Sequence, residues 1–157
     1  PKGICFLHFC GNERPQRDQV EALLTHTYRG SSVAEAPADP LLLQARDALL
    51  SYLDRSRPLP QLPLDLSAGT PFEQSVWQAL CRIAHGSTQS YSAVAAAVGR
   101  PLATRAVGRA CGKNPIAVLV PCHRVIARDG SLGGYSGGLP IKRALLSIES
   151  PSPMDRS

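Results

Sequence analysis

The chain has 157 residues, of which 43% are hydrophobic and 5% aromatic, and its formal net charge is +5. This length fits one domain or two small ones, and no apolar run approaches the ~18 residues that a membrane-spanning helix requires. Five scattered cysteines, an odd number without framework spacing, argue against a disulfide scaffold and favour a reducing compartment.

The first 66 residues are expected to form a small N-terminal α/β domain. Residues 4–10, ICFLHFC, have the character of a short strand, and residues 15–28 carry one apolar helical face. A second helix begins at Pro40, behind the N-cap residue Asp39. Its apolar residues recur at helical spacing: Leu42, Ala45, Leu49 and Leu53.

Residues 67–150 are expected to form a second domain, behind a proline-rich linker at residues 55–71. The run TPFE, which starts at Thr70, is a capping box with proline at the first helical position, so it predicts a helix that ends near Ile83. Two short helices are predicted next, at residues 91–99 and 101–114, with a tight glycine-containing turn between them. Such a pair is typical of a helix-turn-helix.

The remaining segments of the second domain surround the motif VPCHRV. An apolar run at residues 116–120 has the character of a buried strand, and a glycine-rich loop occupies residues 129–138. A last helix is predicted from Pro140 to about Glu149. Residues 151–157 are predicted to be a disordered tail.

The predicted helix 101–114 combines small side chains with an i, i+4 arginine pair, Arg105 and Arg109. One interpretation is an ordinary packing helix whose arginines lie in solvent. The other is a DNA-binding helix that approaches a narrow groove closely, reads sequence poorly and inserts an arginine where a base has been flipped out of the stack. The second interpretation agrees with the charge pattern, because residues 100–128 contain six cationic residues and no acid.

The motif VPCHRV, residues 120–125, carries the strongest candidate for chemistry. A lone cysteine is most often a buried structural residue. However, Pro121 interrupts strand pairing just before Cys122, and His123 and Arg124 make the surroundings electropositive, which would lower the pKa of the thiol. In an extended segment adjacent side chains point to opposite faces, so His123 would act on the thiol through a turn or a bridging water.

Glu149 is a candidate to orient His123, because an acid at the last turn of a helix opposes the macrodipole and needs a reason to be there. The alternative is an exposed surface glutamate. No metal site is predicted, because the spacing of the available cysteines and histidines matches no familiar zinc finger. The set considered is Cys5, His8, Cys10 and His26.

Five motifs together resemble the O6-alkylguanine-DNA alkyltransferases, also called methylated-DNA–protein-cysteine methyltransferases. They are the YSAVA run from Tyr91, the helix ATRAVGRACGKNP, the PCHRV core, the loop GGYSGG and the final LLSIE. The resemblance extends from Ile4 to Glu149. An Asn-Pro pair upstream of PCHRV and a Tyr-Ser-Gly-Gly loop downstream make it far more specific than a lone Cys-His pair.

The resemblance implies DNA repair by direct reversal. An alkyl group would pass from O6-alkylguanine, or from O4-alkylthymine, to Cys122 after base flipping, once per molecule and irreversibly. His123 would take the thiol proton through a water, Glu149 would orient His123, and Asn114 would be a buried hinge amide. Tyr91 would donate a hydrogen bond to the departing base.

The resemblance also implies the residues that bind substrate and DNA. The substrate-binding group comprises the pocket wall Tyr135, the backbone amide of Ser136, the carbonyls of Cys122 and Val125, and Gly137. The DNA-binding group comprises Arg105, which would fill the gap in the stack, together with Ala103, Thr104, Ala106, Gly108 and Arg109.

By the same resemblance, the N-terminal domain would be ribonuclease-H-like and the C-terminal one mostly helical and winged-helix-like. The partner would be double-stranded DNA with alkylated bases, bound through the minor groove by a monomer in the cytoplasm, on the nucleoid if bacterial, without cofactor, metal or membrane. The family has a further strand before Ile4, so a chain that starts at Pro1 is expected to be truncated. The alternatives are a lesion-binding protein without chemistry, the C-terminal half of a bifunctional adaptive-response regulator, and another kind of thiol enzyme.

Overall fold

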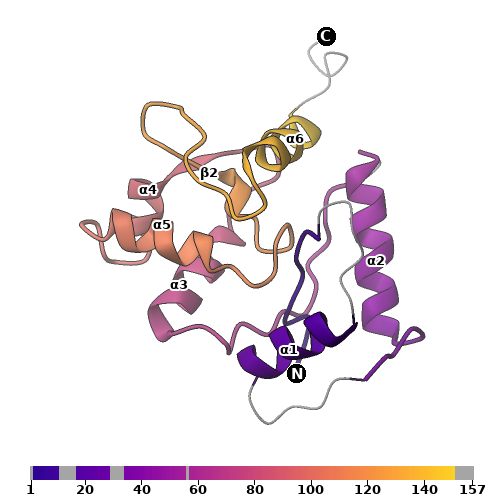
Figure 1. The fold of residues 1–157 in the computed structure, drawn as a ribbon. Helices are drawn as coiled ribbons and strands as arrows, with labels where there is room; N and C mark the ends of the chain where they lie inside the picture. The colour runs from indigo at the N-terminus through magenta and orange to yellow at the C-terminus, as the bar shows by residue number, and fades with distance from the viewer. Residues whose placement is uncertain (1, 11–16, 29–33, 56, 151–157) are drawn as a thin grey trace.

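The computed structural model describes residues 2–10, 17–28, 34–55 and 57–150. It has a mixed α/β fold in which helices predominate (Figure 1). The regular sheet of this described part is a parallel pair, in which Gln89 of β1 is aligned with Val125 of β2. The elements, in chain order, are α1 (Arg17–Thr27), α2 (Pro40–Leu53), α3 (Pro71–Leu80), β1 (Gln89–Ser90), α4 (Tyr91–Ala97), α5 (Thr104–Gly112), η1 (Cys122–Arg124), β2 (Val125–Ile126) and α6 (Leu139–Glu149).

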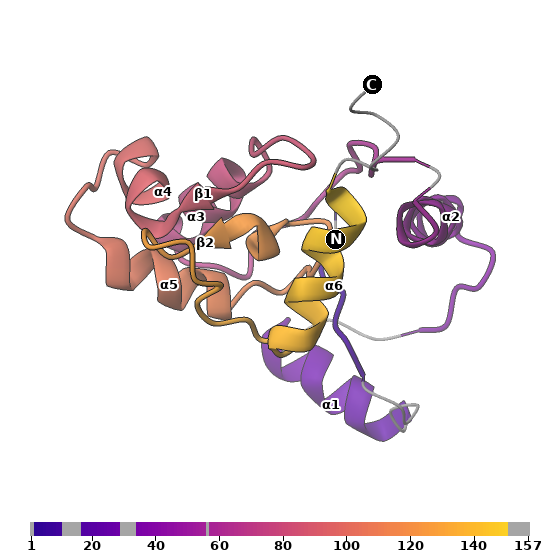
Figure 2. The same cartoon turned by 90° about the horizontal axis from the view of Figure 1, so that it is seen from above.

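The helices form two groups with α6 between them. Helices α3, α4 and α5 pack against one another on one side, and α6 contacts both η1 and α2. Figures 1 and 2 show α2 on the far side of α6 from the α3–α5 group. None of the helices in the described ranges is long and apolar enough to cross a membrane. The predicted tail, residues 151–157, and the start of the helix predicted from Pro15 lie outside those ranges.

Helix α3 begins at the capping box that the sequence predicts. The Thr70 hydroxyl accepts from the Glu73 amide at 3.3 Å, and the Glu73 carboxylate accepts from the Thr70 amide at 2.9 Å. The Trp77 indole donates to the Ala110 carbonyl at 2.8 Å, which ties α3 to α5. The helix ends at Leu80, earlier than predicted, although the turn that follows still buries Ile83.

Helices α4 and α5 form the predicted pair. The Ser90 side chain caps α4, and Gly99, with φ 71°, turns the chain in a conformation that favours glycine. Helix α5 starts at Thr104 rather than at residue 101, because the residues before it form the turn between the helices. Val107 and Ala110 are buried against the neighbouring helices, whereas Leu102 in the turn is almost fully exposed.

Two segments predicted as strands are irregular. Residues 4–10 make isolated parallel bridges, Ile4 with Leu64 and Leu7 with Ile116, instead of a continuous ladder. The run 116–120 is a turn in which Val118 has φ 71°. Prolines at both ends of this run, which have no amide hydrogen to donate, prevent a longer ladder from forming.

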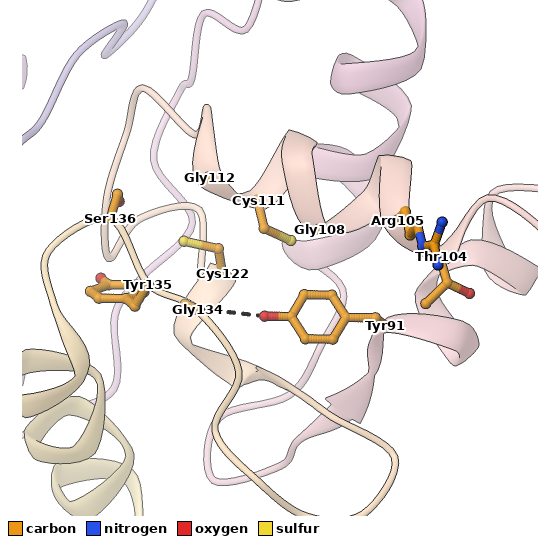
Figure 3. A pocket seen from close by; sticks show the side chains of 10 residues that line it. All are labelled: Tyr91, Thr104, Arg105, Gly108, Cys111, Gly112, Cys122, Gly134, Tyr135 and Ser136. Carbon is orange, nitrogen blue, oxygen red and sulfur yellow. Dashed lines mark hydrogen bonds between the residues drawn. The ribbon is translucent and has the colours of Figure 1, made fainter.

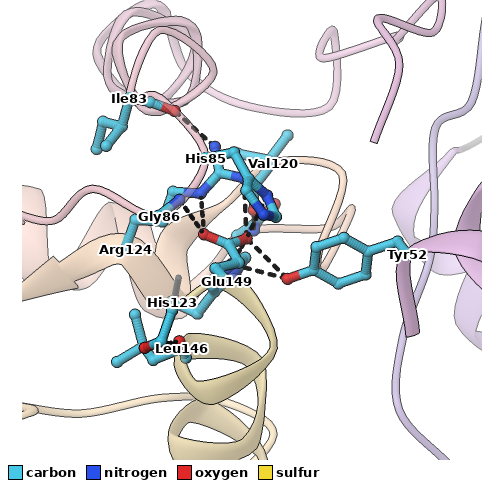
Figure 4. Close-up of polar contacts among 11 residues, drawn as sticks. Tyr52, Ile83, His85, Gly86, Val120, His123, Arg124, Leu146 and Glu149 are labelled. Carbon is cyan, nitrogen blue, oxygen red and sulfur yellow. Dashed lines mark hydrogen bonds and ion pairs between the residues drawn. The ribbon is translucent and has the colours of Figure 1, made fainter. Parts of the chain in front are cut away.

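The buried face of helix α2 only partly matches the predicted one: of the predicted positions, Ala45 is buried and Leu49 is partly buried. Ala45 and Tyr52 are its buried residues, whereas Leu42 and Leu53 are each 50% exposed. Positions 45 and 52 are two turns apart and therefore lie on one stripe of the helix. Ala45 belongs to the same core cluster as Ile4, whereas Tyr52 packs with Leu145 and so extends towards α6 (Figure 4).

Candidate functional site

A pocket of about 540 Å³ opens beside Cys122 (Figure 3). Helices α4 and α5 line one side, and the loop that precedes α6 lines the other. Its volume is that of a typical small-ligand site. The lining residues are Tyr91, Thr104, Arg105, Gly108, Cys111, Gly112, Cys122, Gly134, Tyr135 and Ser136.

Tyr91 packs closely against the glycine-rich loop, residues 129–138. The Tyr91 hydroxyl donates to the Gly134 carbonyl at 3.4 Å. Gly133 has φ 64°, and a Cβ atom there would lie 2.8 Å from the Tyr91 hydroxyl, so only glycine fits at this position. The loop backbone thereby approaches the tyrosine closely and leaves the pocket open towards Cys122.

The thiol of Cys122 faces the pocket, and the residue as a whole is 4% exposed. The Asn114 side-chain amide donates to its sulfur at 3.1 Å and to the Val120 carbonyl at 2.8 Å, while the Asn114 oxygen accepts from the Ile116 amide at 3.0 Å. Asn114 therefore fixes the turn that carries the cysteine, and it also offers a hydrogen bond to the sulfur. Such a bond favours a thiolate over a thiol.

The predicted lowering of the thiol pKa is wrong for this structure. Burial raises the pKa of Cys122, and the hydrogen bond from Asn114 only partly opposes this effect. Arg124, on which the prediction relied, points away from the sulfur and pairs with Glu149 at 2.8 Å. The thiol is consequently protonated at neutral pH and needs a base before it can act as a nucleophile.

His123, the next residue along the chain, is fully buried. The chain turns at η1 instead of continuing as a strand, so the His123 ring leaves the backbone in another direction and meets Glu149, with Nε2 at 2.9 Å from Oε1. Burial lowers the pKa of His123, so the ring is neutral at neutral pH. Because Nε2 faces a carboxylate, the hydrogen resides on Nε2. Its Nδ1 has no hydrogen-bond partner among the described residues and is free to accept a proton.

Glu149 is buried at the end of α6 and not on the surface, which rules out the alternative reading of this residue. Burial alone would raise the pKa of Glu149, but hydrogen bonds from His123, Arg124 and Tyr52 outweigh it and hold the pKa far below its ordinary range. Figure 4 shows these donors converging on the carboxylate. The Tyr52 hydroxyl donates at 2.7 Å and the Gly86 amide at 3.2 Å.

Lys142 of α6 binds the backbone on the other side of the site. It is fully buried, and its Nζ donates to the carbonyls of Val125, at 2.6 Å, and of Leu132 and Gly134. Burial lowers the pKa of Lys142. By joining three carbonyls, this ammonium group fixes the glycine-rich loop against β2. The Val125 carbonyl, expected to accept from the substrate, thus already accepts from Lys142.

The structure brings most predicted site residues together, in two layers. Tyr91, Thr104, Arg105, Gly108, Cys122, Tyr135 and Ser136 line the pocket, whereas Asn114, His123, Val125 and Glu149 lie behind Cys122 or beside it. Gly137 packs against Phe9 and Tyr135. Arg109 is exposed one turn beyond Arg105 on α5, and Ala103 and Ala106 are half-buried on the same helix or at its start.

The site residues that were not predicted include Tyr52, Cys111, Arg124 and Lys142. Arg124 is inside VPCHRV, but the motif does not reveal that its partner is Glu149. Lys142 shares a helical face with Leu145 and Leu146, three and four residues later, and this position was a usable signal for its burial. Cys111 is a second thiol on the pocket wall, and burial raises its pKa to about 12. Tyr52 carries no local signal of function.

No three side chains of His, Cys, Asp or Glu in the described ranges gather into a metal-binding arrangement. Of the four candidates for a zinc site, Cys5 lies beside Tyr28, whose hydroxyl donates to the Cys5 carbonyl at 2.5 Å. Cys10 is exposed and donates to the His8 carbonyl at 3.8 Å.

Comparisons with known proteins indicate one family. Residues 71–151 match the family model "6-O-methylguanine DNA methyltransferase, DNA binding domain". The chain is 46% identical over 134 residues to "Methylated-DNA--protein-cysteine methyltransferase" of Mycobacterium tuberculosis, with 85% of this chain and 81% of that protein covered. It is 46% identical over 135 residues to "Regulatory protein ada" of Salmonella typhimurium but spans only 38% of its length. The crystal structure of Mycobacterium tuberculosis OGT in complex with DNA is similar with a TM-score of 0.66 and 47% identity, over 71% of each chain.

Proposed function

This chain belongs to the methylated-DNA–protein-cysteine methyltransferase family, and on that premise we propose that Cys122 is its alkyl acceptor. The protein binds DNA and repairs it by direct reversal through alkyl transfer. The observation that supports the assignment is the arrangement around Cys122, a pocket-facing thiol that accepts from Asn114 and has the neutral His123 and the anionic Glu149 behind it.

The proposed reaction is a single displacement at the alkyl carbon of O6-alkylguanine. A water carries the thiol proton to His123 Nδ1, and the imidazolium formed is stabilised by the adjacent carboxylate of Glu149. The sulfur then forms a bond to the alkyl carbon while the carbon–oxygen bond breaks and its electron pair stays on guanine. The Tyr91 hydroxyl, at the pocket wall, donates to the base as this charge develops.

The pocket is proposed to hold the flipped base between Tyr91 and Tyr135. The backbone amide of Ser136 would bind the guanine oxygen, and the carbonyls of Cys122 and Val125 would accept from the exocyclic amine. A carbonyl has two acceptor positions, so Val125 retains one beside Lys142. Gly137 supports this wall by letting Tyr135 pack closely, and O4-alkylthymine is proposed as a second substrate.

The product is a thioether, and no step of this scheme regenerates the thiol. We therefore expect one alkyl group per protein molecule, however much substrate is supplied. The test is incubation with an excess of duplex DNA carrying isotopically labelled O6-methylguanine, followed by counting of protein-bound label. Transfer that stops at a one-to-one ratio supports the proposal, whereas repeated turnover, or binding without labelling, contradicts it.

Helix α5 is proposed to enter the minor groove. Arg105 lies at the rim of the pocket and is exposed, so it can occupy the gap that a flipped base leaves, and the small residues of α5 permit a close approach. The other proposed contacts come from the start and exposed side of this helix: Ala103, Thr104, Ala106, Gly108 and Arg109. The protein is proposed to act as a monomer on double-stranded DNA.

Arg105→Ala is expected to slow repair at saturating duplex DNA by roughly ten- to a hundredfold. Unstacking a base costs a few kcal/mol, and the variant lacks the side chain that would occupy the gap left by the flipped base. Arg109→Ala is the matched control, since it removes the same charge from the same helix but does not line the pocket. Both variants should lose only a few-fold in duplex affinity. Transfer from free O6-benzylguanine should be unchanged in both; an equal loss with free base and with duplex would refute a role in flipping.

The N-terminal part, residues 1–66, is proposed to be the family's ribonuclease-H-like domain and residues 67–150 its winged-helix-like domain. A bifunctional regulator is less favoured, because a relative named as a methyltransferase matches at the same identity over 81% of its length. A lesion-binding protein without chemistry is also less favoured, because the acceptor cysteine is in place.

A further inference from the structure

One side chain of the N-terminal part of the chain, Tyr52, reaches the carboxylate that holds the proposed base. Tyr52, on α2, is fully buried, and its hydroxyl donates to Glu149 Oε1 at 2.7 Å (Figure 4). The same hydroxyl is 3.5 Å from His123 Nε2. Glu149 lies 97 residues further along the chain, so this contact exists only because α2 packs against α6.

The contact with Glu149 explains why the Tyr52 hydroxyl can be buried. A buried tyrosine hydroxyl needs a hydrogen-bond partner, and here the partner is the carboxylate that holds the proposed base. Burial, followed by the hydrogen bond to Glu149, raises the pKa of Tyr52 above its ordinary range, so the hydroxyl remains a donor. Leucines elsewhere on α2 are half-exposed, which shows that this helix does not bury all of its large side chains.

We propose that Tyr52 is a positioning residue for alkyl transfer, through which the N-terminal part of the chain completes the active site. The proposal rests on the proposed role of Cys122 and His123. Glu149 Oε1 accepts from Tyr52, from His123 and from the Nη2 of Arg124. The Tyr52 hydroxyl thus fixes the carboxylate oxygen that faces the imidazole and takes up part of its negative charge.

Loss of the Tyr52 hydroxyl is expected to raise the pKa of His123. A carboxylate with one donor fewer attracts the His123 proton more strongly, so the imidazole stays protonated to higher pH. Because His123 must be neutral to accept the thiol proton, the acid limb of the rate profile moves to higher pH. The titratable and charged groups that face Tyr52 from the surrounding elements are His85, His123, Arg124, Tyr135 and Glu149.

Tyr52→Phe in the full chain tests the proposal, because it removes only the hydroxyl and keeps the ring contact with His85, whose centroid is 6.0 Å away. Tyr28→Phe is the matched control, since it deletes a tyrosine hydroxyl whose partner, the Cys5 carbonyl, lies outside the site. Single-turnover transfer from free O6-benzylguanine and from alkylated duplex DNA is measured between about pH 5 and pH 8, where histidine titrates.

For Tyr52→Phe we expect the acid limb of the rate profile to move to higher pH by roughly half to one pH unit with both substrates. The affinity of this variant for duplex DNA should be unchanged. The pH profile of Tyr28→Phe should coincide with that of the unmodified protein. A uniform loss of rate at every pH, or no change, would overturn the proposal. Should Tyr52→Phe fail to fold, site-specific 3-fluorotyrosine at position 52, a stronger donor, must move the limb to lower pH. If the unmodified protein transfers nothing to Cys122, the proposed function fails first; normal transfer with an unmoved limb refutes the role of Tyr52 alone.

Discussion

Cys122→Ser is expected to reduce alkyl transfer by on the order of a thousandfold or more while DNA binding persists. Serine keeps the shape of the side chain, but its hydroxyl is a far weaker acid than the thiol, so His123 cannot generate the nucleophile efficiently. The measurement is single-turnover transfer from O6-methylguanine in duplex DNA, with affinity for the same duplex measured in parallel.

Cys111→Ala is the control for this variant, because Cys111 is the other thiol on the pocket wall. Burial raises its pKa to about 12, and no hydrogen bond from Asn114 or other amide side chain reaches its sulfur in the described part of the chain. We therefore expect Cys111→Ala to retain transfer. If Cys111→Ala abolished transfer while Cys122→Ser kept it, the acceptor would be Cys111.

Glu149→Gln is expected to destabilise the protein by about 3–5 kcal/mol, because it leaves the buried Arg124 without its counter-ion. For a chain of this length that loss corresponds to a melting temperature lower by roughly 10 °C. Transfer should also fall by on the order of a hundredfold or more, since the imidazolium of His123 loses its partner. Thermal unfolding and single-turnover transfer at a temperature where the variant is folded measure the two effects.

The stability effect of Glu149→Gln has a defined pH dependence. The carboxylate has a depressed pKa in the folded protein, so its contribution is complete above the ordinary value of 4.5 and is lost as the pH falls below it. The difference between the two proteins should therefore be full at neutral pH and shrink only in acid. Glu73→Gln is the control: its partner Lys113 is 67% exposed, and breaking such a pair costs about 0–1 kcal/mol. A similar loss in both variants would contradict the account of Glu149.

The starts of α2, α3 and α4 and the pocket-facing motif were predictable because their signals are local. The capping box at Thr70 and the positions of Cys122, Tyr91 and Arg105 follow from short stretches of sequence, together with the family resemblance. Proline-bounded turns were harder to predict, because the apolar run 116–120 has the composition of a strand and only its flanking prolines indicate otherwise.

The electrostatics of the site could not be predicted from sequence, because they depend on contacts between distant residues. Arg124 is two residues from Cys122 in sequence, yet it pairs with Glu149 25 residues later, so its charge does not act on the thiol as expected. Tyr52 and Lys142 become visible as site residues only when α2 and α6 are packed. The thiol is protonated at rest, so the proposed transfer depends on its base more strongly than the local charge alone suggests.

The most direct test identifies the cysteine that carries the transferred methyl group. It separates alkyl transfer to Cys122 from transfer to another cysteine and from lesion binding without chemistry. The protein is incubated with duplex DNA containing O6-methylguanine, digested, and its peptides are analysed by tandem mass spectrometry. The account predicts that one methyl group is added, on the peptide and residue of Cys122, with Cys5, Cys10, Cys81 and Cys111 unmodified. A methyl group on any other cysteine, or an unmodified Cys122 in protein that has bound the lesion, would contradict it.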